Sequence, residues 1–210
     1  VTNQNDKTLS LTDKKLSESP FLSSGIGGIL HVASNYSRRF EEVILQVPKG
    51  RSLKGINVST NRGQTTIINA SLENATLNTN GYLLRIEGSR IKNSKFKTPN
   101  IINIFSTELT DSQLESTKSH FYVDNIKVYG KVELTSKNEL SITLTQKESQ
   151  EINLDLSSHY GPIYQLSRDE SQHHPNELSN PYKTEKTDVK GQLIAKAEDY
   201  ISLETTANKP

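Results

Sequence analysis

The residues whose types could do chemistry together lie in one short stretch, residues 169–177. There, Glu170, His173 and His174 offer carboxylate and imidazole groups, which are ligands for zinc and similar ions. However, the two histidines are adjacent and Pro175 follows them at once. The spacing that puts two histidines on one helical face, with a glutamate between them, is missing. These three residues stay candidates, and the sequence predicts no metal site, no cofactor and no catalytic residue.

The elements that must position any functional side chain follow a repeat of about 18 or 19 residues. The repeat runs from residue 51 to residue 142, and in it large apolar residues recur in three rows. Each row stacks when one coil of a solenoid buries its apolar side chains on the next coil. The pattern predicts an all-β, parallel β-solenoid with three short strands per coil. The rows are Leu77, Phe96, Leu114 and Val132; Leu72, Ile91, Leu109 and Val128; and Ile86, Ile104, Val123 and Ile142.

A finer pattern of five residues lies inside each coil. Residues 70–74 (Ala-Ser-Leu-Glu-Asn) and 75–79 (Ala-Thr-Leu-Asn-Thr) each place a small residue two positions before a large apolar one. These units resemble degenerate pentapeptide repeats, which form right-handed parallel β-helices, and the resemblance covers roughly residues 51–142. About eight residues per coil do not follow the five-residue rule. That irregular form is similar to the β-helix domains of bacterial effectors delivered by type III secretion, including HECT-like ubiquitin ligases.

The remaining segments divide the chain by composition. Residues 1–24 are polar without a period, which predicts a flexible tail. Residues 25–50 contain two apolar runs that we expect to form N-terminal cap strands. The β-helix is expected to cover residues 51–156. Residues 157–191 lose the apolar period and contain several prolines, which favours a loop or a disordered segment.

Residues 192–206 match the spacing of an amphipathic helix, with apolar side chains at offsets of 0, 1, 4, 7 and 8. We therefore expect a short C-terminal helix that caps the solenoid. The apolar residues of this pattern are Leu193, Ile194, Ala197, Tyr200 and Ile201.

Composition narrows the classes of function. The 25 basic and 24 acidic residues nearly cancel, which argues against a nucleic-acid partner. No apolar run is long enough for a membrane span. The sequence has no Cys, which excludes disulfides and thiolate chemistry and is compatible with a secreted protein.

Strand alternation predicts which side chains face outward. If Leu84, Ile102, Phe121 and Leu140 point inward, the residues just before them form an outward row, which is Leu83, Ile101, His120 and Glu139. This outward face carries apolar and aromatic side chains in adjacent coils. Exposed apolar clusters of this kind often mark a contact surface. The predicted binding residues are Leu83, Ile101, Phe105 and Tyr122.

These observations favour a non-catalytic module that presents a rigid face to a protein partner. The effector resemblance implies secretion, delivery into a host cell and a host- or substrate-binding role, with any catalysis in another domain. Two alternatives stay open. An adhesin or phage-tail-like fibre segment would share the solenoid, and a carbohydrate-active β-helix enzyme would place acidic residues on an outward face.

Overall fold

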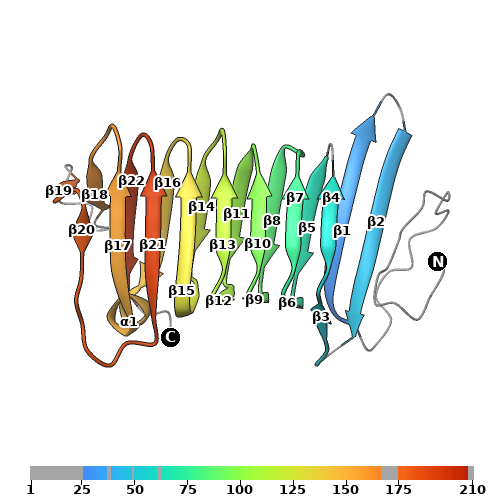
Figure 1. Cartoon of the computed structure of the whole chain (residues 1–210), viewed down its shortest axis with the longest axis horizontal. Helices are drawn as coiled ribbons and strands as arrows, with labels where there is room; N and C mark the ends of the chain where they lie inside the picture. Colours follow the sequence, from blue (N-terminus) through green and yellow to red (C-terminus); the bar gives the residue numbers. More distant parts are fainter. Residues whose placement is uncertain (1–25, 37–38, 49, 61–62, 167–174, 208–210) are drawn as a thin grey trace.

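The protein is an elongated β-solenoid whose strands stack side by side along the long axis (Figure 1). The computed structural model describes residues 26–36, 39–48, 50–60, 63–166 and 175–207. Within the coils, neighbouring strands pair in parallel, as for β8 with β11 and β7 with β10. The all-β parallel solenoid expected from the repeat is thus confirmed.

Sheet A forms one wall of the solenoid and contains ten strands. In spatial order these are β19 (Asn176–Leu178), β18 (Ile163–Leu166), β22 (Ile201–Thr206), β16 (Leu140–Thr145), β14 (Phe121–Asp124), β11 (Ile101–Phe105), β8 (Leu83–Glu87), β5 (Gln64–Ile68), β1 (Ile26–Tyr36) and β2 (Arg39–Pro48).

Sheets B and C form the other walls and are joined by the long strand β15 (Lys127–Ser136). Sheet B contains β3 (Ser52–Lys54), β6 (Ser71–Glu73), β9 (Arg90–Lys92), β12 (Glu108–Thr110) and the first part of β15. Sheet C contains β4 (Asn57–Thr60), β7 (Thr76–Thr79), β10 (Lys95–Thr98), β13 (Gln113–Ser116), the second part of β15, β21 (Gly191–Ala197), β17 (Ile152–Ser158) and β20 (Tyr182–Lys183).

The predicted apolar rows form the core between the walls, with one correction. Two rows pair in register as expected, from Leu72 to Val128 and from Ile86 to Ile142. In the third row, Leu114 pairs with Leu134 and not with Val132. The step is two residues longer than predicted because β15 turns the corner as one continuous strand. Val132 still points inward and is fully buried.

The corners of the coils explain the five-residue units. Asn74, Asn93 and Asp111 occupy equivalent corners with φ near +50°, which asparagine and aspartate tolerate better than most residues. The small residue after each corner faces inward and is buried, as for Ser94 and Ser112. At these corners an αL residue is followed by a small one, whereas the αL residue Asn125 is followed by the buried Ile126.

Buried hydroxyl groups connect successive coils at these corners. Ser94 Oγ accepts a hydrogen bond from the backbone N–H of Ala75 at 3.0 Å and donates one to the carbonyl of Lys92 at 2.7 Å. Ser112 Oγ repeats the arrangement in the next coil, accepting from the N–H of Ser94 at 3.1 Å. A matching column runs through Ser89 and its neighbours at the other corner. These bonds satisfy backbone donors that would otherwise be buried without partners.

The N-terminal end is covered by an antiparallel hairpin. β1 pairs with β2 and also antiparallel with β5, so the hairpin extends sheet A beyond the first coil. It occupies the range 25–50, where the sequence indicated cap strands. The tail expected at residues 1–24 lies outside the described residues.

The stretch after the fifth coil is more structured than the sequence indicated. Helix α1 (Gln146–Glu151) begins with a capping box between Thr145 and Glu148 and leads into β17. Within residues 157–191, where we expected a loop or disorder, the structure has the short strands β18, β19 and β20. Residues 167–174 lie outside the described part of the chain.

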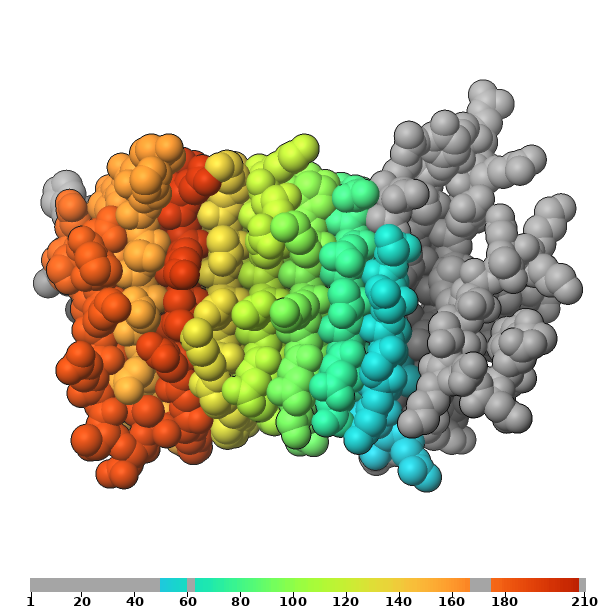
Figure 2. Space-filling model, viewed as in Figure 1, coloured from blue at the N-terminus to red at the C-terminus, as the bar shows by residue number. Residues whose placement is uncertain are grey.

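The predicted C-terminal helix is wrong, because residues 191–206 form strands β21 and β22. β21 lies between β15 and β17, and β22 lies between β16 and β18. In Figures 1 and 2 this red segment separates the yellow and orange coils. Leu193 and Ala197 on β21 are spaced by four residues, which is an even number and so keeps them on one side of a strand as well as of a helix. Residues 191–206 form strands because β21 and β22 each pair with the coils on both sides of them.

Candidate functional site

The outward face of sheet A carries all four residues predicted to bind a partner. Leu83 and Ile101 lie side by side on β8 and β11. Phe105 lies further along β11, and Tyr122 lies on β14 beside Asn103. Their neighbours Leu84, Ile102 and Phe121 are fully buried, so the predicted in–out alternation is correct. Binding by these residues stays a prediction. We call this surface the sheet A face.

One end of the sheet A face combines an aromatic ring with an ion pair. The Arg85 guanidinium lies over the Phe105 ring, with its central carbon 5.6 Å from the ring centroid. The same guanidinium donates two hydrogen bonds to Glu87 Oε2, at 2.7 and 3.1 Å. Arg85 is thus held by a charge pair within its own strand and by a cation–π contact with the next coil.

The other end of the face contains a cluster centred on Glu139. The Tyr122 hydroxyl donates a hydrogen bond to Glu139 Oε1 at 2.9 Å, and the Tyr200 hydroxyl donates one to Oε2. His120 Nδ1 lies 3.6 Å from Oε1, a contact that is ionic only when the imidazole is protonated. The Tyr164 ring packs edge-on against the Tyr200 ring, with centroids 6.2 Å apart. We call these five residues the Glu139 cluster.

Successive coils bring the members of the cluster together. The backbone N–H of Phe121 bonds to the carbonyl of Glu139, and the N–H of Leu140 bonds to the carbonyl of Tyr200. His120, Glu139 and Tyr200 therefore occupy equivalent positions just before β14, β16 and β22. Tyr200 reaches Glu139 only because β22 is inserted beside β16.

The carboxylate makes both phenols harder to ionise. Its hydrogen bond from the hydroxyl is the main reason that the pKa of Tyr200 rises to about 12. For Tyr122, partial burial raises the pKa first, and the hydrogen bond to Glu139 adds to it. In both cases a phenolate would lose a donated hydrogen bond and face a negative charge.

Two polar atoms at the middle of the sheet A face are buried without a hydrogen-bond partner among the described residues. They are Asn103 Oδ1 and His120 Nδ1. Asn103 lies between Arg85 on β8 and Tyr122 on β14. Buried polar atoms that lack a partner are costly in a folded protein, which makes this middle region unusual.

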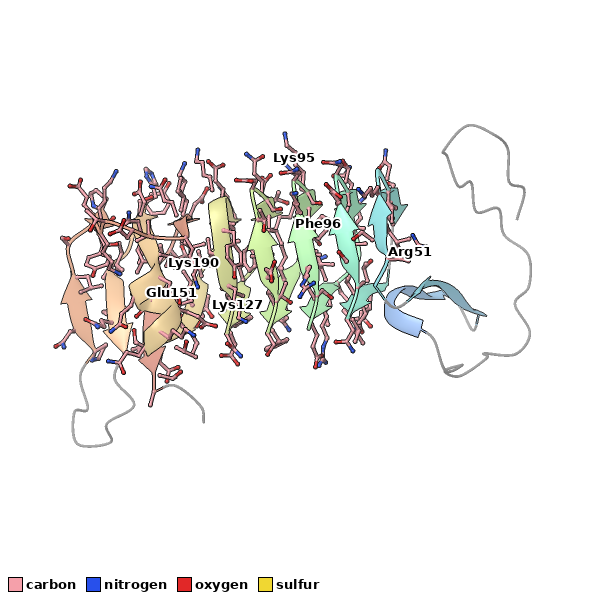
Figure 3. All side chains as sticks on the ribbon, turned by 90° about the horizontal axis from the view of Figure 1, so that it is seen from below. Arg51, Lys95, Phe96, Lys127, Glu151 and Lys190 are labelled. Carbon is pink, nitrogen blue, oxygen red and sulfur yellow. The ribbon has the colours of Figure 1, made fainter. Side chains whose placement is uncertain are left out.

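Sheets B and C differ in chemistry from the sheet A face. Their outward charges pair across neighbouring coils, as in Lys54 with Glu73 at 2.9 Å and Lys97 with Glu115 at 2.9 Å. Near the C-terminal end, Lys190 pairs with Glu151 at 2.8 Å, and Lys127 lies close by (Figure 3). Exposed pairs of this kind add little stability but leave each carboxylate neutralised.

The metal candidates Glu170, His173 and His174 lie outside the described residues, so their role stays a prediction. Within the part of the chain that the structure describes, no three His, Asp or Glu side chains gather as a metal site. An open depression of about 310 Å³ includes Asp155 and Lys183 in its lining, and these two residues pair at 3.1 Å.

Sequence reasoning found part of the Glu139 cluster. It placed His120 and Glu139 on an outward row with Leu83 and Ile101, because all four precede inward residues by one position. It missed Tyr200, which it assigned to a helix. The alternation of Leu193, Ala195 and Ala197 was the signal that could have indicated a strand.

The fold and this face define an all-β parallel solenoid module with one aromatic and apolar wall and two ion-paired walls. The chain belongs to the Toastrack DUF4097 family, whose model matches residues 1–204. No curated protein and no solved structure matched the chain significantly. Among the described residues, no helix is long and apolar enough to cross a membrane.

Proposed function

We propose that this chain is a non-catalytic recognition module that binds a protein partner through the sheet A face. The observation that carries the proposal is the difference between the walls. Sheets B and C present paired charges, while sheet A, beside the single Arg85–Glu87 pair described above, presents Leu83, Ile101, Phe105 and Tyr122 in adjacent coils. Aromatic side chains that are partly exposed contribute strongly to protein interfaces.

The solenoid supports this role because it holds the face rigid. Parallel pairing and the buried hydroxyl columns fix each coil on the next, as at Ser94 and Ser112. A rigid surface loses little conformational entropy when a partner binds.

The test compares capture of a partner by three forms of the chain. The Phe105→Ala/Tyr122→Ala variant removes two rings from the sheet A face. The matched control, Lys97→Ala/Glu115→Ala, removes an exposed ion pair from sheet C. We expect a partner captured from cell extract to be lost with the first variant and kept with the control, while both variants keep the native circular-dichroism spectrum. Retention by the first variant would refute the proposal.

Secretion and delivery into a host cell belong to the same proposal, supported by the resemblance of residues 51–142 to effector solenoids. Fractionation of the producing bacterium with an antibody to the chain tests it. We expect the chain in the culture medium, and its confinement to the cells would contradict secretion.

A further inference from the structure

Glu139 differs from the ion-paired carboxylates in how its charge is satisfied. Among the described residues, at least eight carboxylates have a Lys or Arg partner within 4 Å, with side-chain exposed fractions of 24% to 42%. Glu139 has none of these ion pairs; its partners are two phenols and a histidine, and its side chain is only 19% exposed. Those eight carboxylates belong to Glu73, Glu87, Glu108, Glu115, Glu133, Glu151, Glu198 and Asp155.

The strands beside Glu139 also lack positive charge. No Lys or Arg occupies an outward position of β14, β16, β22 or β18. Asp124 adds a carboxylate on β14. A partly buried negative charge beside strands that carry no Lys or Arg favours a cationic ligand.

The cluster offers the two kinds of contact that a cationic side chain uses. A carboxylate has about four acceptor positions, and the hydroxyls of Tyr122 and Tyr200 occupy two of them. The remaining positions can accept hydrogen bonds from an ammonium or guanidinium group. The rings of Tyr122 and Tyr200 lie beside the carboxylate and can contribute cation–π contacts.

We infer that the Glu139 cluster binds one Lys or Arg side chain of an extended peptide, whose apolar residues pack on Leu83, Ile101 and Phe105. This inference rests on the proposed function, because it uses the same face and names the chemistry of its partner. The apolar residues and the carboxylate lie on one wall, so a single segment running along the solenoid axis contacts both.

The coil spacing sets how far apart the basic residue and the apolar residues lie along that peptide. Glu139 lies two coils from Ile101 in the stacked row that also contains His120. Two coils span about 10 Å, since parallel strands lie about 4.8 Å apart. An extended peptide advances about 3.3 Å per residue, and side chains on one of its faces recur every second residue. The basic residue is therefore expected two to four positions from an apolar one.

The experiment is selection of phage-displayed random dodecapeptides on the full chain, followed by titration of synthetic copies of the enriched peptides. We expect enriched peptides to contain Lys or Arg at that distance from an apolar residue. Replacing Arg by citrulline, or Lys by norleucine, should weaken binding roughly tenfold or more. The Glu139→Gln variant should lose as much affinity for the charged peptide. Combining this variant with the neutral peptide should lower the affinity no further than either change alone.

The matched control is Glu115→Gln, which alters an exposed carboxylate on sheet C and should leave the dissociation constant unchanged. The Tyr122→Phe variant keeps the ring and the fold but removes one hydroxyl donor, and should still prefer the charged peptide. Thermal unfolding checks that Glu139→Gln remains folded. If Glu139→Gln does not remain folded, the Tyr122→Ala variant is titrated in its place. We expect that variant to lose the preference for the charged peptide over the neutral one.

The outcomes separate this inference from the proposed function. In one outcome, the enriched peptides lose affinity with Ile101→Asp but bind Glu139→Gln as tightly as the unaltered chain. That result would refute the cation site and leave the proposed recognition face supported. Enrichment of no peptide, or binding that ignores Ile101→Asp and Glu139→Gln alike, would refute both. Binding of a neutral glycan that depends on Tyr122, with no peptide enriched, would also overturn both.

Discussion

The Glu139 carboxylate favours the protonated form of the two tyrosine hydroxyls that donate hydrogen bonds to it. Tyr122 and Tyr200 both donate to it, and neither phenol can ionise without placing a second negative charge beside Glu139. The cluster is thus held together best while the phenols are protonated and the carboxylate is ionised.

We predict that the pKa of Tyr200 falls from about 12 toward the ordinary value of 10.0 in a Glu139→Gln variant. Because the folded-state pKa is raised, the hydrogen bond contributes its full stability below pH 10, and that contribution is lost as the pH rises through 12. Ultraviolet absorbance of phenolate measures the pKa, and a Tyr200→Phe variant identifies which transition belongs to this residue.

The free energy of unfolding provides the second measurement. Between pH 10 and pH 12 it should fall more steeply in the unaltered chain than in the Glu139→Gln variant. Equal slopes in the two proteins, or an unchanged Tyr200 transition, would show that the hydrogen bond does not raise this pKa.

At the scale of the elements, the strands are short, and the corner hydroxyls connect them. Ser94 Oγ is buried and bonds to Ala75 N–H in the previous coil and to its own corner carbonyl at Lys92. In the first two coils the equivalent positions are Ile56, which is only partly buried, and Ala75, so neither coil has a hydroxyl at this corner. The hydroxyl column therefore runs through the coils of Ser94 and Ser112.

We predict that Ser94→Ala lowers the free energy of unfolding by about 1–3 kcal/mol, because it leaves the Ala75 N–H buried without an acceptor. The control is Ser71→Ala, which removes an exposed hydroxyl contact with Ser52. It should change stability by less than about 0.5 kcal/mol. Urea unfolding of both variants gives the comparison, and equal losses would refute the role assigned to the buried column.

For the whole molecule, the order of coils in space differs from their order in the chain. The last strands, β21 and β22, lie inside the stack, and the earlier pair β17 and β18 lies beyond them (Figure 1). Leu193 pairs with Val132 on one side and with Leu154 on the other. The outermost coil therefore cannot pair with the rest until the C-terminal segment is in place.

We predict that a chain ending at Lys190 loses protection of the β17 and β18 amides while the coils from β6 to β14 stay protected. Hydrogen exchange measures this directly. A synthetic peptide of residues 191–206 should restore protection when added, because it supplies both missing strands. The same peptide with Leu193→Asp should fail to do so. Full protection of β17 in the truncated chain would contradict the insertion.

The sequence by itself determined the solenoid, its core rows and the outward direction of Leu83, Ile101, Phe105 and Tyr122. These features follow from local periods, since a coil of about 18 residues with an apolar row can bury that row only on its neighbour. The corners were visible as small residues two positions before each large apolar one.

Only the tertiary structure decided the position of residues 191–206 and, with it, the Glu139 cluster. Apolar residues four apart satisfy a helix and a strand equally, so local pattern could not choose between them. The choice came from two unpaired strand edges, on β15 and β17, that accept β21 between them. Pairing between segments about 60 residues apart in sequence brings Tyr200 to Glu139.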